Sequence, residues 1–352
     1  MRVLHLDSGR EYRGGQDQVR LLARELARAP GVEQRLFTKR GSELARRTAA
    51  AGVLVREVPW GVGLDPRAAW RLVAETLRWR PALIHAHNGH AVTLAVWARR
   101  LLRWAGMADA PRVVATRRVT FPVRAGSALR RADAVVVISE AVRSSLIAAG
   151  FPPTELQLVP SGIDADEVRR AAVGPLELRD RLALAPGTPL AVNVAALEPS
   201  KDQLTLIRAA HRARARCPEL HWAIAGEGPE RGALAALVDR LGLGDRMHLL
   251  GHVERVDAVL AESDVVVMSS RAEGLGTVVL RAVALGRPVV ATRAGGLPEI
   301  VAPEWLVPVG DAEALARTVV QALQHPSPVA LAPQFTAGAM ARGVLALYRS
   351  LV

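Results

Sequence analysis

Cysteine is almost absent from the sequence, which has 352 residues and a single cysteine, Cys217. One cysteine cannot build a disulfide framework or a cysteine-based structural zinc site, and this pattern is typical of a reducing compartment. Long apolar runs are also missing: the longest, such as 134–138 and 265–268, fall far short of the ~20 residues that a membrane-spanning helix needs. Residues 1–7 turn polar too soon for a signal peptide. These absences predict a soluble, cytoplasmic protein.

Lysine is scarce as well. Lys39 and Lys201 are the only lysines among 46 basic side chains, and the formal net charge is +12. The excess lies in the first half, since residues 1–163 carry 26 basic and 13 acidic side chains, whereas residues 164–352 carry 20 and 21. A basic half predicts an anionic partner, which could be a membrane surface, a phosphorylated substrate or a nucleic acid. An arginine bias of the source would give the same numbers, so both interpretations stay open.

The composition is that of a globular protein, because 50% of the residues are hydrophobic and 23% are charged. At roughly 150 residues per domain, the length suggests two domains. Short apolar runs alternate with longer helical patterns, which is typical of parallel sheets covered by helices. The predicted strands are 2–6, 34–38, 53–58, 83–86, 112–115 and 134–138 in the first half, and 190–194, 222–225, 247–250, 265–269 and 288–291 in the second.

We therefore predict an α/β protein with two doubly wound, Rossmann-like domains that face a central cleft, with ligands at the carboxyl ends of the strands. The first domain spans 1–163 and the second 164–330, because Pro160 and Gly162 interrupt the pattern between them. After a proline-rich break, residues 331–352 form a last apolar helix.

The strongest candidate for chemistry is the segment 269–281, where a predicted strand ends and a loop with two glycines opens a helix near Thr277. Free backbone N–H groups and the helix dipole would point at one spot there, which suits a phosphate or a diphosphate. Glu273 lies on this loop, at the predicted cleft. The alternative is that the glycines only make a tight turn and that Glu273 is solvated.

Two further loops occupy equivalent places. Lys201 follows the predicted strand 190–194 and precedes a helix, where its ammonium can hold a phosphate as a point charge. Because the chain otherwise uses arginine, a lysine here favours a functional role. Residues 8–15, which end in Gly14 and Gly15, follow the first strand and form a plausible loop for an anion or for hydroxyls.

Taken together, these elements resemble the retaining glycosyltransferases of family 4, which have the two-domain GT-B fold. The resemblance runs along nearly the whole chain, and its specificity comes from the order of several weak motifs. The matching segments are 14–15, 132–140, 159–164, 198–202, 225–229, 273–276 and 295–299, and the last helix resembles the one that returns to the N-terminal domain.

The resemblance implies an N-terminal domain that binds the acceptor and a C-terminal domain that binds a nucleotide-activated sugar. Lys201 would stabilise the departing diphosphate in place of a metal ion, and Glu273 would hold hydroxyls of the donor sugar, which makes these two the catalytic positions. The leaving phosphate would take the acceptor proton, with retention at the anomeric carbon. Implied donor-binding positions are Leu275, Gly276, Thr277 and Arg281, and implied acceptor positions are Gly14, Gly15, His87, Asn88 and Arg118.

The sequence departs from the family pattern at three places. A second glutamate eight positions after the first would bind the nucleotide ribose, but Arg281 stands there, and an arginine cannot accept a hydrogen bond from a hydroxyl. Ala196 replaces an arginine that would contact the diphosphate, and residues 116–118 replace a frequent histidine. The chain thus resembles a subgroup that lacks the second glutamate of the paired motif, and the identity of its donor stays open.

Other motifs are weaker. The glycines of 226–228 have the wrong spacing for a dinucleotide fingerprint, and the carboxylates of 164–166 make a weak metal site. His85, His87 and His90 leave a strand without a nearby carboxylate or cysteine, so we interpret them as residues that line the cleft, with His87 or Asn88 touching acceptor hydroxyls, and expect no metal.

A possible membrane contact lies in the stretch 93–107, which places Trp97, Leu101 and Trp104 at helical spacing beside Arg99, Arg100 and Arg103. Such a helix could lie on an anionic membrane. Ordinary packing of the apolar side chains against the sheet, with a solvated basic face, is the alternative.

The sequence thus predicts a cytoplasmic, metal-independent retaining transferase of hexosyl or heptosyl type that needs no cofactor and acts in cell-surface polysaccharide or lipopolysaccharide assembly. Its expected partners are a nucleotide sugar and a saccharide or lipid-linked acceptor, with peripheral contact to an anionic membrane as an option and no nucleic acid, for want of a motif. The alternatives are a degenerate member that binds nucleotide or glycan without turnover, and a nucleotide-sugar epimerase on the same fold.

Overall fold

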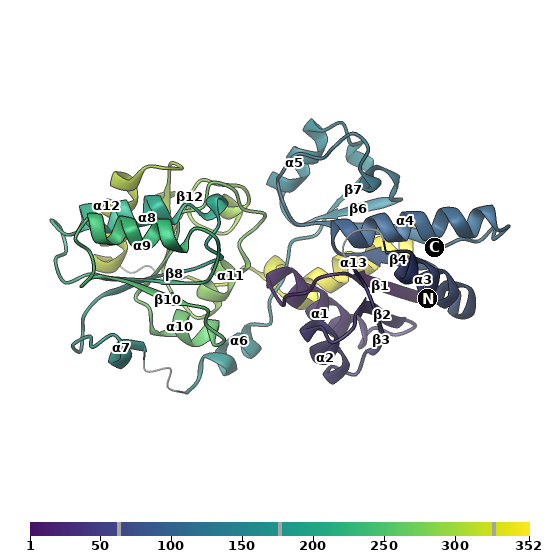
Figure 1. The fold of residues 1–352 in the computed structure, drawn as a ribbon, viewed down its shortest axis with the longest axis horizontal. Helices are drawn as coiled ribbons and strands as arrows, with labels where there is room; N and C mark the ends of the chain where they lie inside the picture. Colours follow the sequence, from purple (N-terminus) through teal and green to yellow (C-terminus); the bar gives the residue numbers. More distant parts are fainter. Residues whose placement is uncertain (62–64, 175–177, 326–328) are drawn as a thin grey trace. The chain divides into compact units, whose positions relative to one another are not determined.

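The computed structural model describes residues 1–61, 65–174, 178–325 and 329–352. They form two compact units, one made of Met1–Gly162 with Pro333–Val352 and one made of Ile163–Ala332 (Figure 1). The chain changes units after residues 162 and 332, and the predicted limits were 163 and 330. The acceptor and donor roles of the two units, and a cleft between them, stay predictions.

The first unit contains a seven-stranded parallel sheet in the order β3-β2-β1-β4-β5-β6-β7. Its central strands β4 and β6 are buried at every position, because helices cover both faces, and this explains their continuous apolar runs. The strands are β1 (Arg2–Asp7), β2 (Glu33–Lys39), β3 (Leu54–Val58), β4 (Leu83–Ala86), β5 (Arg112–Arg117), β6 (Ala134–Val137) and β7 (Leu156–Leu158).

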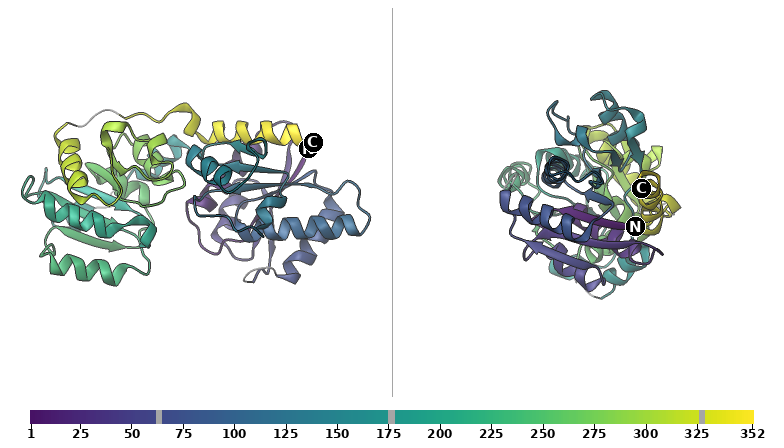
Figure 2. Two further views of the ribbon diagram at one scale, coloured as in Figure 1. Left: turned by 90° about the horizontal axis from the view of Figure 1, so that it is seen from above. Right: turned by 90° about the vertical axis from the view of Figure 1, so that its right-hand side faces the viewer.

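Two groups of helices cover this sheet. Helix α1 packs with α2 and α13, whereas α3 packs with α4. Figure 2 shows α4 and the yellow α13 on opposite faces of the sheet. The helices of this unit are α1 (Gly14–Leu26), α2 (Glu43–Ala50), α3 (Pro66–Trp79), α4 (Gly89–Trp104), α5 (Glu140–Ala148) and α13 (Ala337–Leu351).

Helix α13 completes the core of the first unit although it comes from the end of the chain. Its side chains Met340, Val344 and Tyr348 are buried in one cluster with Val3 and with residues of α1. The two chain ends lie near each other in both views of Figure 2. The first strand and the last helix therefore depend on each other for burial.

The two points where the chain changes units lie against each other inside the first unit. The backbone N–H and C=O of Gly162 are both bonded to the side-chain amide of Gln18, at 3.0 and 2.8 Å. A Cβ atom at Gly162 would lie 2.3 Å from the carbonyl oxygen of Thr336, which caps α13. Only a glycine allows this approach of the outgoing and returning segments.

The second unit contains a six-stranded parallel sheet in the order β10-β9-β8-β11-β12-β13. The strands are β8 (Leu190–Val194), β9 (His221–Ala225), β10 (Met247–Gly251), β11 (Val265–Met268), β12 (Val289–Thr292) and β13 (Leu306–Val307). The helices are α6 (Ala165–Ala172), α7 (Leu178–Arg181), α8 (Gln203–Ala213), α9 (Arg231–Arg240), α10 (Val256–Glu262), α11 (Thr277–Ala284) and α12 (Ala312–Gln324). No helix in the described parts of the chain combines the length and the apolar character needed to cross a membrane.

The strand order reverses direction once in each sheet, between β1 and β4 in the first unit and between β8 and β11 in the second. The loops that follow these strands diverge to opposite sides, which opens a crevice at the carboxyl edge of such sheets, where ligands bind. The prediction of two doubly wound α/β units is confirmed. The sequence analysis missed the edge strands β7 and β13, which have only 3 and 2 residues.

Candidate functional site

The two predicted catalytic residues lie in contact. The Nζ atom of Lys201, on the loop after β8, lies 2.5 Å from Oε2 of Glu273, on the loop after β11. Their side chains are 21% and 14% exposed, so the ion pair is largely shielded but reachable from one side. Because β8 and β11 are the strands at the reversal of strand order, the pair marks the expected ligand crevice of the second unit.

Backbone contacts hold the two loops together. The N–H of Arg271 donates to the carbonyl oxygen of Ser200 at 2.8 Å, and Ser269 Oγ donates to the carbonyl oxygen of Lys201 at 2.9 Å. Asp202 adopts a left-handed conformation (φ 47°), caps α8, and pairs with Arg271 at 2.9 Å. The positions of the ammonium and the carboxylate are therefore set by the loops as well as by their own attraction.

Glycines bring further backbone close to Glu273. Gly295 has φ +52°, and a Cβ atom there would lie 1.7 Å from the carbonyl oxygen of Glu273. Gly276 has φ +96° and precedes α11, and no side chain caps this helix in the described structure. The first N–H groups of α11 thus form a partial positive charge beside the loop of Glu273, as the sequence predicted.

The remaining predicted donor residues have different surroundings. Thr277 is the first residue of α11. The side chain of Leu275 is 1% exposed, so only its backbone can face a ligand. One guanidinium nitrogen of Arg281 donates to both carboxylate oxygens of Asp257, at 2.7 Å each. Asp257 is 7% exposed and comes from α10, and the sequence analysis gave no sign of it.

The predicted acceptor residues gather at the carboxyl edge of the first sheet. Gly14 and Gly15 are the first residues of α1, after the loop that follows β1. Asn88 follows β4, caps α4, and accepts a hydrogen bond from Ser8 Oγ at 2.7 Å. This bond joins the loops after β1 and β4, which flank the reversal of strand order.

Arg118, after β5, lies beside these loops. Its Cδ atom would be 3.7 Å from a Cβ atom at Gly15, and its Nε atom is buried without a partner in the described structure. Burial lowers the pKa of Arg118 to about 10, and the nearby carboxylate of Asp7 acts in the opposite direction. Arg118 is therefore a cation at neutral pH, and its free donor suits an anionic or hydroxyl-bearing ligand.

Asp7 is a polar residue at this edge that the sequence analysis did not single out. Its Oδ1 atom accepts from the N–H of Gly9 at 2.7 Å and from Gln16 at 3.3 Å. Burial raises the pKa of the Asp7 carboxyl, and these hydrogen bonds and Arg118 oppose that shift. The available signal in the sequence was an aspartate directly after the predicted strand 2–6, at the edge where ligands bind.

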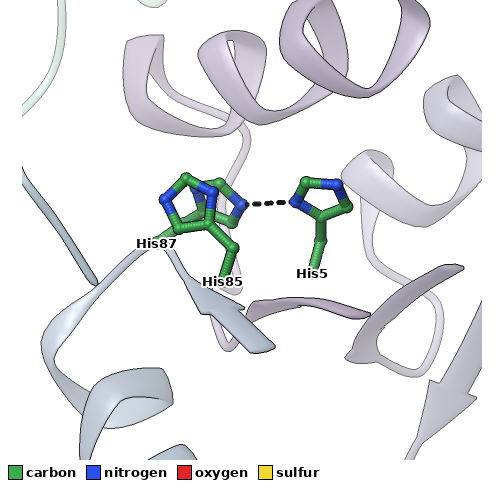
Figure 3. A group of neighbouring side chains, drawn as sticks. All are labelled: His5, His85 and His87. Atoms are coloured by element: carbon green, nitrogen blue, oxygen red, sulfur yellow. Dashed lines mark hydrogen bonds between the residues drawn. The ribbon is translucent and has the colours of Figure 1, made fainter. Parts of the chain in front are cut away.

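The interpretation of the histidines needs correction. His85 and His87 are 0% and 3% exposed and do not line an open surface, and His5 of β1 joins them in place of the exposed His90 (Figure 3). His5 Nδ1 lies 3.1 Å from His87 Nε2. The two strands are neighbours, and their alternate residues reach the same face, which the sequence pattern did not reveal.

Three ring nitrogens from this cluster lie within 4.8 Å of one another, a spacing at which a metal ion could be held. The existing contacts compete with that role, because His85 already bonds to the Tyr348 hydroxyl and to Thr116. Burial lowers the pKa of all three rings, that of His5 to about 4, and Arg118 adds repulsion for His85 and His87. The arrangement therefore favours neutral, hydrogen-bonded histidines.

Two family models match the chain. Residues 12–167 match the model described as Glycosyltransferase Family 4, and residues 188–325 match the one described as Glycosyl transferases group 1. Together they cover both units and both groups of site residues.

Curated relatives have the same character. The chain is 36% identical over 190 residues to a GDP-mannose-dependent alpha-(1-6)-phosphatidylinositol monomannoside mannosyltransferase of Mycolicibacterium smegmatis, a match that covers 50% of each protein. It is 31% identical over 367 residues to the 2-deoxystreptamine N-acetyl-D-glucosaminyltransferase of Streptomyces fradiae, covering 91% of this chain and 85% of that protein. The chain thus spans only about half the length of the mycobacterial relative.

Solved structures share the fold. The Anabaena protein HepE in complex with UDP and glucose superposes with a TM-score of 0.82 at 20% identity, over 99% of this chain and 100% of that one. At this identity the likeness shows the fold alone, which is the GT-B arrangement of two Rossmann-like units.

Proposed function

Because the chain belongs to glycosyltransferase family 4, we propose that it moves a sugar from a nucleotide-sugar donor to a saccharide or lipid-linked acceptor, with retention of anomeric configuration. The observation that carries this proposal is the contact of Lys201 with Glu273 at the point where the strand order of the second sheet reverses. The proposed donor unit is residues 163–332, and the proposed acceptor edge lies in the first unit.

Lys201 is the proposed electrostatic catalyst. When the bond between the anomeric carbon and the diphosphate oxygen breaks, negative charge develops on that oxygen, and the ammonium together with the N-terminus of α11 stabilises it. This positive charge does the work for which other transferases use a divalent cation, so we propose a metal-independent reaction. Asp202 and Arg271 keep the lysine loop in place.

Glu273 is the proposed ligand of the donor sugar, because a carboxylate accepts hydrogen bonds from hydroxyls. In the structure its Oε2 atom is occupied by Lys201 and lies 3.5 Å from Ser270 Oγ. Donor binding would then exchange part of this ion pair for contacts to the sugar and the diphosphate. The acceptor oxygen forms the new bond to the anomeric carbon, and its proton passes to the leaving phosphate oxygen.

The acceptor would lie at the carboxyl edge of the first sheet, near Arg118, Asn88 and the glycines that begin α1. The unpartnered Nε atom of Arg118 favours an acceptor with anionic or hydroxyl groups. His87 is buried and would act through the position of its loop instead of through direct contact. We propose hexosyl or heptosyl transfer in cell-surface polysaccharide or lipopolysaccharide assembly in the cytoplasm.

A second candidate is a family member that binds nucleotide or glycan without turnover. Arg281 favours it, because it replaces a ribose-binding glutamate of the family pattern and is held by Asp257. Ala196 also lacks the guanidinium of that pattern. An epimerase on the same fold is a third candidate that no specific contact favours.

A panel of nucleotide sugars separates these candidates. We expect hydrolysis or transfer from one donor by the native protein, with strong loss in Lys201→Met and Glu273→Gln and little change in the surface controls Arg208→Met and Glu254→Gln. Binding of UDP or GDP without turnover of any donor on a broad acceptor panel would support the second candidate, a family member without transferase activity. Interconversion of a nucleotide sugar without transfer would support the epimerase.

A further inference from the structure

One face of helix α4 is left uncovered. Trp97, Leu101 and Trp104 are 47%, 37% and 88% exposed, and their spacing of four and three residues places them on one side of the helix. Most of the eight buried residues of α4 lie on its other side, among them Ala95 and Leu102. The alternative that these three apolar side chains pack against the sheet is therefore wrong.

Arg99 does not belong to this exposed face, contrary to the sequence prediction. It is 8% exposed and pairs with Asp133. Arg100 and Arg103 are exposed at the same end of the helix. Other arginines lie closer together, around the first half of α4.

They lie in a pocket beside the first half of α4, with a volume of about 720 Å³. Trp97 and Val96 form its helical wall, and the segment after β5 forms the other. Three arginines, Arg117, Arg124 and Arg131, also line it. The pocket thus combines apolar walls with three guanidinium groups.

None of these three guanidiniums has a carboxylate partner among the described residues. Arg117 donates to the carbonyl oxygens of Val119 and Phe121, which holds it in the loop, and burial lowers its pKa. Arg124 and Arg131 are exposed and make no side-chain hydrogen bond in the described structure. Three positive charges without a carboxylate partner around one hollow create a positive potential that attracts an anion.

Further apolar side chains are exposed on the elements around it. Phe121 is 53% exposed on the loop that Arg117 holds, and Trp70 is 73% exposed on α3, the helix that packs with α4. Exposed tryptophans beside arginines are typical of surfaces that lie at the headgroup level of a bilayer. A single-stranded nucleic acid would be attracted to the arginines and could stack bases on the tryptophans, so it is the competing ligand in the test below.

We propose that this surface, formed by Trp97, Leu101 and Trp104 with the arginine pocket, binds an anionic phospholipid bilayer, with a lipid phosphate in the pocket and the helix face in the headgroup layer. Lipid binding at this surface would give part of the positive charge excess of residues 1–163 a function. It concerns lipid binding alone and does not depend on glycosyl transfer.

Vesicle cosedimentation of the full chain, without nucleotide sugar, tests the proposal. We expect binding to phosphatidylcholine vesicles with about 30% phosphatidylglycerol and little binding to pure phosphatidylcholine, with weakening as salt rises. Arg124→Gln with Arg131→Gln is expected to weaken binding about 25-fold, since each surface arginine contributes roughly a factor of five. Trp104→Ala is expected to weaken it about tenfold.

The matched control is Arg342→Gln with Arg349→Gln, which removes two exposed arginines from α13 on the other face of the sheet. An equal loss in this control would overturn the proposal, because net charge alone would then explain binding. Arg124→Lys with Arg131→Lys, which keeps the charge, is expected to restore most of the affinity, and thermal melts of each variant exclude unfolding.

Three other outcomes would also overturn the proposal. Equal binding to neutral and anionic vesicles would show that the arginines do not bind the net negative charge of the anionic headgroups. Tighter binding of a single-stranded RNA than of anionic vesicles, with the same arginine dependence, would assign the surface to nucleic acid. If soluble glycerol phosphate alone, at the same phosphate concentration, displaced the protein from vesicles, the ligand would be a free phosphate ester instead of a bilayer.

Discussion

Lys201 and Glu273 neutralise each other across 2.5 Å, although 72 residues separate them in the sequence. Each is attached to a loop at the carboxyl end of a central strand, and the two loops are joined by the backbone bond from Arg271 to Ser200. Each charged group is therefore held by a partner of opposite charge from the other loop.

This pairing predicts opposite effects on nucleotide binding. Lys201→Met should weaken binding of UDP or GDP, because the diphosphate loses its cation. Glu273→Gln should leave binding as tight or make it tighter, because the ammonium is no longer engaged by a carboxylate. Calorimetric titration of both variants measures this, and a comparable loss in both would contradict the assignment of the two charges to separate parts of the donor.

Turnover should fall in both variants. Loss of a preorganised positive charge at a leaving group costs on the order of 10²- to 10³-fold in rate, which we expect for kcat/KM of Lys201→Met. Glu273→Gln should lose less, because the amide still accepts one hydrogen bond from a sugar hydroxyl. Initial rates with the donor identified in the panel provide the measurement, and an unchanged kcat/KM in Lys201→Met would remove the lysine from the mechanism.

Gly295 should be intolerant of any side chain. A methyl group there would overlap the carbonyl oxygen of Glu273, so Gly295→Ala should displace the Glu273 loop and lower the free energy of unfolding by about 3 kcal/mol or more. Gly310→Ala is the matched control, because Gly310 also has a positive φ (+80°) but has open space around its Cα. It should cost only about 1 kcal/mol, and chemical denaturation compares the two.

The contact of Arg281 with Asp257 predicts a stability effect. Arg281→Met leaves a carboxylate that is 7% exposed without its cation, which should cost about 2–3 kcal/mol. Arg281→Met with Asp257→Leu should recover much of that loss, since both charges are gone. Denaturation curves test this, and nucleotide affinity measured on the same variants tells whether Arg281 also reaches the donor.

The histidine cluster predicts a loss of stability in acid. Below the ordinary histidine pKa of 6.5 the unfolded chain binds protons, whereas His5, with a pKa of about 4, stays neutral in the folded state. Stability is therefore complete above pH 6.5 and falls toward pH 4, by on the order of 3 kcal/mol for His5 alone. The raised pKa of Asp7 opposes part of this loss.

Chemical denaturation of the full chain at pH 7, 6 and 5 measures the effect. His5→Gln should flatten the pH dependence while lowering stability at pH 7, because a buried ring is replaced. His90→Gln, at an exposed position on α4, should change neither. The same slope in His5→Gln as in the native protein would show that other groups cause the acid loss.

The sequence predicted that Lys201 and Glu273 both lie at the carboxyl ends of strands, although it did not predict their contact, and the reason is topological. Both residues follow strands whose apolar runs were clear, and parallel strands bring their carboxyl ends to one edge. The sequence does not show that β8 and β11 are neighbours. In any parallel order of the strands, however, both loops would lie at this edge of the sheet.

Contacts between distant side chains were beyond the sequence pattern. Asp257 lies on a short helix whose polar residues looked solvated, and only packing of α10 against α11 brings it to Arg281. His5 looked like an ordinary strand residue until β1 and β4 became neighbours. Arg99 looked like its exposed neighbour Arg100, and a shift of one residue around the helix decides which of them meets Asp133.

The place of α13 in the first unit has a consequence for the order of events during synthesis. Residues 163–332 are continuous in the chain and have their own core, so this unit can fold while the ribosome is still active. The unit that contains β1 has to wait for Met340, Val344 and Tyr348, which are synthesised after the whole of the second unit. The N-terminal half of the protein is therefore the last to mature, and a nascent chain stalled before residue 333 should expose an incomplete core to chaperones and proteases.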